Sequence, residues 1–367
     1  MKKICFFSGD ITRCGGTERV STIIANRFAS IEKYEILILS IVEQNSTTYF
    51  TISSKIRRYS LKKNREWMQP GPKYLSLIPM LRHFLVQMCI DVIIDIDIVL
   101  DILTIPASLG MTVKVISWEH FHYYFEQQFL YRRIIACFSS LFSDYIITLT
   151  QKDKENYEKE LHRNRKIEFI YNPITLPKNP LCFSDNKIIP REHILITVGS
   201  LNKRKGTDLI AKVIPRILHK YRDWKWFFLG DGEYRKRLEV TVRQYRLEKQ
   251  VVLTGNVLNV EIYLKRASIF VLSSRMEGLP MCLLEAKAAQ LPCVSFDIQT
   301  GPSEIIQDDV NGFLIKPFDL NMMVKKIELL IKNEELRNRF SQNAVTGMEK
   351  FQIDSILQKW ERIIDSV

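Results

Sequence analysis

Short apolar runs rich in β-branched residues alternate with helical patterns, and this series occurs twice along the chain. Because the centres of the runs are apolar throughout, they predict strands of parallel sheets that are buried on both faces. Two such series predict an α/β protein with two doubly wound, Rossmann-like domains. The runs of the first series are residues 2–9, 34–42, 91–97, 112–120, 145–150 and 167–174, and those of the second are 193–200, 224–232, 251–256, 268–274 and 293–297.

The two series are joined by a segment with little periodicity. Residues 172–193 carry four prolines, which is typical of a linker. We therefore expect an N-terminal domain over residues 1–175, a linker over 176–192 and a C-terminal domain over 193–347. The remaining residues, 348–367, look helical and must pack on another part of the chain, because one side of this helix is apolar: Phe351, Ile356, Trp360 and Ile364.

Length and composition limit the class of protein. At 367 residues and 46% hydrophobic, the chain can form two domains, each with its own core. No apolar run reaches the roughly 18 residues that a membrane-spanning helix needs, and residues 4–7 read as a first strand rather than a signal peptide. The seven cysteines include no C-x-x-C pair, which favours reduced thiols in the cytoplasm over disulfides or zinc.

The net charge of +12 indicates anionic partners, such as phosphate-bearing substrates, membrane surfaces or nucleic acid. We expect no nucleic acid partner, because the chain has no zinc-finger spacing, RNA-recognition signature or sustained heptads. Residues 55–67 hold six basic residues and one acid, and the apolar residues 74–88 follow them. We expect peripheral binding of this part of the N-terminal domain to anionic membranes. A solvated loop followed by a core helix is the alternative.

The loops that follow the strands are where chemistry is expected, since ligands of open α/β sheets bind beyond the carboxyl ends of the strands. The first such loop, within residues 8–24, carries Gly15 and Gly16 before a helix that starts near Thr17. Paired glycines let backbone N–H groups approach a ligand, and a helix start favours an anion. A tight strand-to-helix turn is the alternative. Neither a dinucleotide fingerprint nor a Walker A stretch occurs.

A second loop, within residues 117–124, places Glu119, His120 and His122 at the end of a strand. Single histidines are commonly structural, but this location favours a functional role.

The third loop, within residues 198–210, is basic. Lys203, Arg204 and Lys205 precede a helix whose expected cap is Thr207. Cations beside a helix N-terminus make a phosphate site, and a solvated basic turn is the alternative.

The fourth loop, within residues 275–296, holds two glutamates with seven residues between them. Glu277 lies on the loop, while Glu285 lies in a helix that begins near Met281 and is surrounded by apolar residues. Backbone amides from Gly278 to Met281 can face a phosphate, and each carboxylate can accept hydrogen bonds from two hydroxyls. The pattern therefore indicates a site for a polyhydroxylated, phosphorylated ligand. A surface helix with scattered acids is the alternative.

Taken together, these motifs resemble the retaining glycosyltransferases of family 4, whose GT-B architecture consists of two Rossmann-like domains facing across a cleft. The resemblance covers essentially the whole chain. Its most specific part is the Glu277-x7-Glu285 pattern with Gly-Leu-Pro inside it. The first glycine loop, the WEH sequence at His120, the GDGE turn at 230–233 and the TGNV sequence at 254–257 also match. The last helix, with Trp360, resembles the one that crosses back to the N-terminal domain.

The resemblance implies a role for each residue. Glu285 holds the ribose of the nucleotide, Glu277 and His120 contact the donor sugar, and Lys205 binds the diphosphate. The loop of Gly15 and Gly16 approaches the phosphates and the acceptor. Further residues expected to bind the donor are Gly199, Arg204, Gly278, Leu279, Pro280, Met281 and Val257.

Two positions depart from the family pattern. Ser200 stands where the family often has an arginine, which would be a second cation beside Lys205 at the diphosphate. Arg204 is the expected replacement for this arginine. Gln290 replaces a glycine at a helix end, where we expect an effect on packing only. We found no candidate nucleophile. The resemblance implies that none is required, because in this family the leaving phosphate of the donor is thought to assist the acceptor from the same face. The acids within residues 95–101 read as a strand end and a helix start, so we expect no metal.

The TGP segment after residue 299 and the apolar Gly-Leu-Pro-Met loop resemble relatives that use UDP-hexoses or UDP-N-acetylhexosamines. By family analogy the acceptor is a lipid-linked or surface-polysaccharide intermediate, as in lipopolysaccharide or capsule synthesis, at the inner face of a bacterial membrane. The alternative is a non-catalytic nucleotide-sugar sensor or scaffold with the same fold. Turnover of nucleotide sugars discriminates the two.

Overall fold

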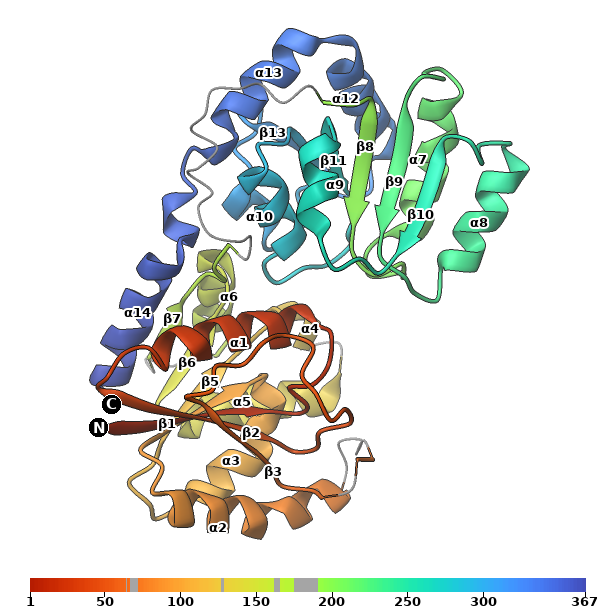
Figure 1. Ribbon diagram of the computed structural model, residues 1–367. Coiled ribbons are helices and arrows are strands. Elements are labelled where there is room, and N and C mark those ends of the chain that lie inside the picture. Colours follow the sequence, from red (N-terminus) through yellow and green to blue (C-terminus); the bar gives the residue numbers. More distant parts are fainter. Residues whose placement is uncertain (64, 67–71, 127–128, 162–165, 175–190) are drawn as a thin grey trace. The chain divides into compact units, whose positions relative to one another are not determined.

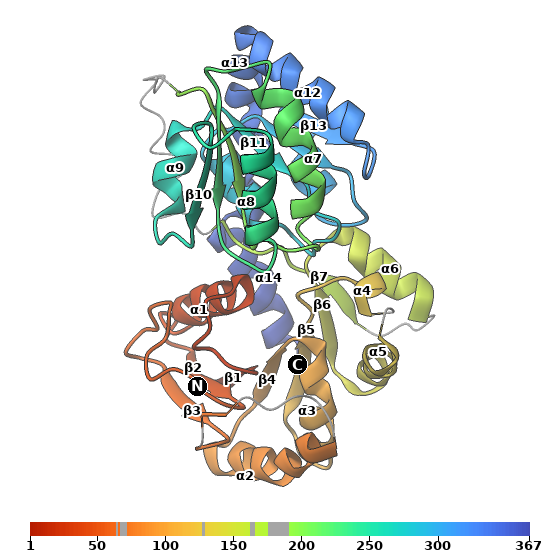
Figure 2. The same ribbon diagram turned by 90° about the vertical axis from the view of Figure 1, so that its right-hand side faces the viewer.

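The computed structural model describes residues 1–63, 65–66, 72–126, 129–161, 166–174 and 191–367. The chain forms two compact units. Unit 1 comprises Met1–Pro173 together with Lys350–Val367, and unit 2 comprises Ile174–Glu349. Most of the predicted linker, 176–192, lies outside the described residues. Each unit contains one parallel sheet with helices on both faces (Figures 1 and 2), so the predicted α/β class with two Rossmann-like domains is confirmed.

The sheet of unit 1 has seven parallel strands in the order β3-β2-β1-β4-β5-β6-β7. The order reverses between β1 and β4, which is where sheets of this kind bind ligands. The strands are β1 (Lys2–Ser8), β2 (Tyr34–Ser40), β3 (Arg57–Ser60), β4 (Val92–Ile96), β5 (Lys114–Trp118), β6 (Tyr145–Thr148) and β7 (Ile167–Phe169).

Alternate residues of β1 show why both faces are covered. Phe6 contacts the Phe28 ring of α1, with ring centroids 6.4 Å apart. Its neighbours Cys5 and Phe7 belong to a core on the other face, which α2 and α3 supply (Figure 1). The helical segments of unit 1 are α1 (Gly16–Phe28), η1 (Pro72–Leu77), α2 (Ile78–Met88), η2 (Ile98–Leu100), α3 (Asp101–Ser108), α4 (Tyr123–Glu126), α5 (Leu130–Phe142), α6 (Gln151–Leu161) and α14 (Ile353–Asp365), with η5 (Glu349–Phe351) at its boundary.

The edge strand β3 is absent from the sequence prediction, because it is short, polar and half-exposed. It comes from the basic segment that was expected to face a membrane. The Arg57 guanidinium forms an ion pair with Glu35, and Arg58 lies 3.0 Å from Glu43. Two of the six cations of this segment are therefore neutralised by neighbouring acids, and Trp67 lies outside the described residues.

The sheet of unit 2 has six parallel strands in the order β10-β9-β8-β11-β12-β13. The sequence prediction missed β13, a short strand that follows a turn. The strands are β8 (Ile194–Val198), β9 (Lys225–Leu229), β10 (Val251–Gly255), β11 (Ile269–Leu272), β12 (Cys293–Phe296) and β13 (Gly312–Ile315).

The helices of unit 2 pack on both faces of its sheet. A large core joins the sheet to α7, α8, α12 and α13, and Figure 2 shows α9 on the opposite side from α7. The helical segments are α7 (Thr207–Leu218), α8 (Arg235–Gln244), α9 (Val260–Arg266), α10 (Met281–Ala288), α11 (Pro302–Ile305), α12 (Leu320–Lys332), α13 (Glu334–Gln342) and η4 (Asn343–Val345).

The last helix, α14, packs on unit 1 through its apolar side. Phe351, Ile356, Trp360 and Ile364 are all fully buried. At the end of the helix, the Tyr34 hydroxyl donates to Asp365 at 2.8 Å. Within the described residues, no helix is both long and apolar enough to cross a membrane.

Candidate active site

The predicted residues Lys205 and Glu277 are in direct contact. The Nζ of Lys205 lies 2.6 Å from Oε1 of Glu277, and the hydroxyl of Ser274 donates to the same oxygen at 2.6 Å. The two side chains are only 18% and 6% exposed, so this is a largely buried ion pair. An ammonium group has three donors, so Lys205 can hold Glu277 and bind a phosphate at the same time.

The backbone before α7 explains how Lys205 reaches this place. The helix cap is Gly206 and not the expected Thr207, which is the first residue of α7. Gly206 has a φ of 71°, and a Cβ at this position would overlap the carbonyl of Ser273. Only glycine fits such a left-handed residue in close contact with another backbone. Gly199 lies beside the Lys205 side chain, since a Cβ there would be 3.5 Å from Lys205 Cε. The basic loop is thus fixed against the strand end from which Glu277 follows.

The glutamate loop is held from both sides. Thr300 Oγ1 donates to the Glu277 carbonyl at 2.6 Å, and the Arg275 N–H donates to the Arg204 carbonyl at 2.8 Å. The loop then enters α10 at Met281, as predicted. The first N–H groups of a helix have no partner within it, and Pro280 has no N–H, so the donors left for an anion are those of Gly278, Leu279, Met281 and Cys282.

Glu285 lies on α10 and is 3% exposed. Burial raises the pKa of the nearby Cys282 thiol to about 12, and the charges of Lys205, Glu277 and Glu285 all act on this thiol. The three predicted residues therefore gather around the first turns of α10. Glu285 has an interaction within the protein, and a carboxylate can accept further hydrogen bonds, such as those that vicinal hydroxyls donate.

The other predicted residues of unit 2 differ in their surroundings. The half-buried Arg204 has no acidic partner among the described residues, so its charge is available to a ligand. Val257 lies in the loop after β10. Sequence reasoning missed Arg275, which anchors the basic loop through two bonds to Asp208 at 2.6 and 2.7 Å. Its position two residues before Glu277 was the available signal.

In unit 1, His120 follows β5 and is 9% exposed. Burial lowers the pKa of His120 to about 3, so the imidazole is neutral at physiological pH. Its Nε2 has no hydrogen-bond partner among the described residues. Unpartnered buried polar atoms are uncommon in proteins, so this nitrogen is a candidate to contact a ligand.

The neighbours of His120 have structural surroundings. The Glu119 carboxylate is fully buried and accepts the Phe121 N–H at 2.7 Å and the Tyr157 hydroxyl at 3.4 Å. It therefore fixes the turn that contains His120. His122 is 4% exposed and has contacts of its own within the protein.

The first glycine loop has a local explanation for one of its two glycines. A Cβ at Gly15 would overlap the Glu18 carboxylate, and Arg13 Nε donates to that carboxylate at 2.9 Å. The glycine therefore makes room for a protein carboxylate beside the start of α1. An added Cβ at Gly16 would have no heavy atom within 4 Å, so open space lies next to this residue.

Two of the three acids within residues 95–101, Asp95 and Asp101, lie side by side in the core of unit 1 and interact with each other. Asp95 and Asp101 are fully buried, and burial raises the pKa of both carboxyls, that of Asp101 to about 6. Thr104 donates to Asp95 at 2.9 Å and Ser117 to Asp101 at 2.5 Å. Asp97 instead pairs with Arg132 at 3.2 Å. In the described part of the chain, no three His, Cys, Asp or Glu residues are placed to hold a metal ion.

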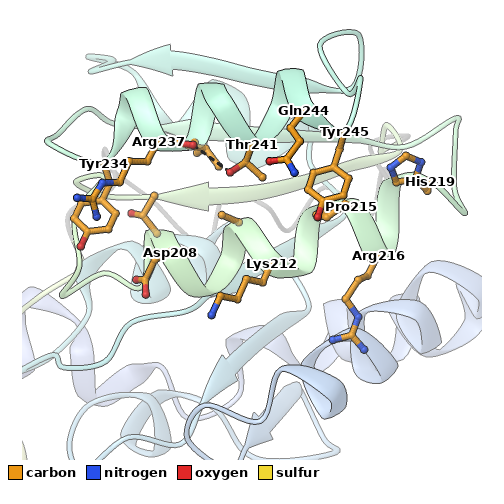
Figure 3. A pocket seen from close by; sticks show the side chains of 13 residues that line it. Asp208, Lys212, Pro215, Arg216, His219, Tyr234, Arg237, Thr241, Gln244 and Tyr245 are labelled. Atoms are coloured by element: carbon orange, nitrogen blue, oxygen red, sulfur yellow. Dashed lines mark hydrogen bonds between the residues drawn. The ribbon is translucent and has the colours of Figure 1, made fainter.

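A cavity of about 640 Å³ lies apart from these residues, between α7 and α8 (Figure 3). None of the predicted site residues lines it. Asp208, which does, is already bound to Arg275. Tyr234 and Arg237 stack on each other at one end of the cavity (Figure 3). This cavity is therefore not the candidate active site.

Comparison with known proteins identifies the family. The family model for glycosyl transferases group 1 matches residues 182–346. A glycosyltransferase of Haemophilus influenzae, itself uncharacterised, is 32% identical over 365 residues, which is 99% of this chain and 100% of the relative. The chain belongs to the glycosyl transferases group 1 family.

More distant relatives and solved structures agree with this assignment. An N-acetylgalactosaminyltransferase of Campylobacter jejuni is 25% identical over 100% of this chain and 99% of its own. The structure of Staphylococcus aureus TarM superimposes with a TM-score of 0.80 at 15% identity, covering 100% of both chains. At this identity the likeness establishes the fold, which is GT-B.

Proposed function

We propose that this group 1 glycosyltransferase is a retaining enzyme of family 4 that moves a hexose or N-acetylhexosamine from a UDP-linked donor to a lipid-linked or surface-polysaccharide acceptor. The observation that carries the proposal is the buried Lys205–Glu277 pair, which lies with Glu285 around the first turns of α10. The Campylobacter jejuni relative is named for transfer to an undecaprenol-linked glycan, and TarM has been solved with UDP. Both names support this choice of donor and acceptor.

Each residue of the site then has its own role. The Lys205 ammonium and the N–H groups at the start of α10 bind the diphosphate, and Arg204 adds a second cation. Glu277 accepts hydrogen bonds from hydroxyls of the donor sugar, and Glu285 accepts them from the ribose. Hydrogen bonds to charged acceptors are worth roughly 1.5–3 kcal/mol each, which makes these two carboxylates the main source of donor affinity. The neutral imidazole of His120 contacts the donor sugar.

During transfer, the bond between the anomeric carbon and the diphosphate oxygen breaks, and its electrons leave with the diphosphate. Negative charge grows there, and Lys205 with the helix N–H groups stabilises it. The acceptor hydroxyl attacks from the face that the diphosphate leaves, and its proton passes to a diphosphate oxygen. The new glycosidic bond keeps the configuration of the donor, and no protein nucleophile is needed.

The product itself tests this proposal. The purified protein is incubated with UDP-hexoses and UDP-N-acetylhexosamines and with undecaprenol-linked acceptors, and the new anomeric signal is observed by proton NMR. We expect an α-linked product from an α-linked donor. A β-linked product would contradict retention. Donor binding with neither transfer nor hydrolysis would identify the non-catalytic sensor instead.

We further propose that unit 1 binds anionic membranes peripherally at the inner face of the cell membrane. The surface that supports this is the outer side of α5, rather than the basic segment around β3. Leu130, Ile134 and Phe142 recur at helical spacing and are 73%, 60% and 51% exposed. Arg133 is exposed next to them. Exposed apolar side chains beside a cation, on a chain of net charge +12, suit a lipid surface with anionic headgroups.

Sedimentation with liposomes tests the membrane proposal. Binding to vesicles containing anionic lipid is expected to fall in the double variant Leu130→Glu and Ile134→Glu. The matched control, Val240→Glu with Ile262→Glu, changes two exposed apolar residues of unit 2 and is expected to bind as the wild type does. Equal binding of both double variants, or no binding of the wild type, would contradict it.

A further inference from the structure

Two buried tryptophan rings connect the last helix to the candidate histidine. The Trp360 ring of α14 meets the Trp118 ring edge-on, with centroids 4.9 Å apart and planes at 75°. Trp118, the last residue of β5, in turn contacts the His120 imidazole, with centroids 4.4 Å apart and planes at 47°. Trp360 and Trp118 are 0% and 1% exposed, so no water separates the rings from their neighbours.

The backbone on both sides of this contact is held in place. The Asp97 N–H donates to the Trp118 carbonyl at 3.0 Å, and the Glu119 N–H donates to Ile147 at 2.9 Å. The C-terminal end of α14 is held as well, because Lys2 Nζ donates to the Ile364 carbonyl at 2.7 Å. The strand and the helix therefore present their two tryptophans to each other in one arrangement.

The imidazole itself lacks one means of orientation. His120 Nε2 has no hydrogen-bond partner among the described residues, so no bond at that atom fixes the ring. Ring packing must supply that restraint. Aromatic rings at such separations prefer tilted and edge-to-face arrangements, so the contact with Trp118 favours one orientation of the imidazole.

We propose that Trp360 is a positioning residue, which orients the imidazole of His120 through Trp118. The inference rests on the proposed role of His120 at the donor sugar. It gives the C-terminal helix a function in catalysis in addition to its contribution to stability.

The indole nitrogens indicate which property of Trp360 matters. Neither Trp118 Nε1 nor Trp360 Nε1 has an acceptor within the described structure. Replacing Trp360 by phenylalanine therefore breaks no hydrogen bond and keeps an aromatic ring against Trp118. Replacing it by leucine removes the ring while leaving an apolar side chain in the core.

Phe351 offers a matched control. It is also fully buried in the C-terminal segment, and its ring packs on Tyr171 of unit 1 at 4.7 Å, away from the contact of Trp118 with His120. Phe351→Leu thus removes an aromatic contact of the same segment and leaves the side chains of Trp360, Trp118 and His120 unchanged.

The kinetic test compares Trp360→Leu, Trp360→Phe and Phe351→Leu with the wild type at saturating donor, below the unfolding temperature of each variant. Misplacing a reacting group by about 1 Å can cost 10²-fold in rate, so we expect Trp360→Leu to lower kcat on the order of 10–100-fold with little change in donor KM. Trp360→Phe and Phe351→Leu are expected to stay within about twofold. Equal losses of kcat in the two leucine variants would overturn the proposal.

NMR of the protein labelled at histidine tests the geometry without turnover. The chain has six histidines, and the signal that is lost in His120→Gln is assigned to His120. Because Trp118 lies against the imidazole, its ring current shifts the His120 signal, and Trp360→Leu is expected to move that signal while Phe351→Leu does not. If the His120 signal does not move in Trp360→Leu, the inference is wrong, whether or not the wild type transfers sugar. If the wild type transfers sugar and the His120 signal moves while kcat stays unchanged, the inference is wrong as well.

Discussion

The Nζ of Lys205 lies 2.6 Å from Oε1 of Glu277, although the two residues are 72 positions apart in the sequence. Lys205 follows β8 and Glu277 follows β11, and these strands are neighbours in the sheet of unit 2. The strand order therefore brings the cation that we propose for the diphosphate next to the carboxylate that we propose for the donor sugar. The predictions below separate what each residue of this site contributes.

Glu285→Gln is expected to raise the donor KM and leave kcat nearly unchanged. Glutamine keeps the shape of the side chain but weakens its hydrogen bonds to the ribose, which is remote from the bond that breaks. A loss of roughly 1–2 kcal/mol corresponds to a KM increase of about 5–30-fold. Steady-state kinetics at varied donor concentration measures the effect. A fall in kcat with an unchanged KM would assign Glu285 to the chemical step instead.

Arg204→Ala tests whether this residue replaces the arginine that is absent at position 200. Its guanidinium has no acidic partner within the described residues, so we expect it to bind the growing charge of the diphosphate. The expected result is a fall in kcat approaching that of the Lys205 variant. The matched control is Lys203→Ala, an exposed cation on the same loop. Wild-type kinetics for both variants would leave the diphosphate to Lys205 and the helix N–H groups.

Activity is expected to persist in excess EDTA. The proposed site neutralises the diphosphate with Lys205, Arg204 and N–H groups, so that no metal ion is required for charge stabilisation. Product formation is measured with and without chelator, and again after adding magnesium or manganese. A complete loss of activity that either metal restores would contradict the proposal.

The buried Asp153 is expected to make stability depend on pH. It is 1% exposed, and burial raises its pKa to about 7, above an unfolded value of about 3.9. Between these values the folded protein keeps a proton that the unfolded chain has lost, so stability falls as the pH rises from about 4 to about 7.

Asp153→Asn removes this titration and keeps an oxygen that can accept the Tyr123 N–H. From pH 5 to pH 8 in urea unfolding, the wild type is expected to lose about 1–3 kcal/mol more stability than the variant. The control Asp309→Asn changes a side chain that is 73% exposed, and its pH dependence is expected to match the wild type. An equal slope for Asp153→Asn would show that the aspartate is ionised throughout.

The fold was predictable where strands are buried on both faces, because their centres are apolar without interruption, as in residues 4–7 of β1, 92–94 of β4 and 269–272 of β11. It was not predictable at β3, whose Arg57 and Arg58 look like a solvated basic segment and become an edge strand through pairing with β2. In the site, the residue types and their spacing indicated Lys205 and Glu277. Their contact depends on strand order and on Gly206, neither of which periodicity specifies.

Other parts of the site could not be predicted because they depend on tertiary contacts. Gly15 looked like a residue that admits a ligand, yet the structure uses its space for the Glu18 carboxylate. Arg275 was not singled out in the sequence, but it fixes the loop of Lys205 by binding Asp208. The contact of Trp360 with Trp118 joins the two separate sequence segments that form unit 1, and no local pattern indicates it.

The central claim is that Lys205 stabilises the charge of the leaving diphosphate, and kcat of Lys205→Ala at saturating donor tests it most directly. Removing one such electrostatic contact typically costs about 2.7–4 kcal/mol in the transition state. We therefore predict that kcat falls roughly 10²–10³-fold in a folded protein, while Lys203→Ala retains wild-type activity. Full kcat for Lys205→Ala at saturating donor would contradict the placement of the diphosphate, and with it the proposed active site.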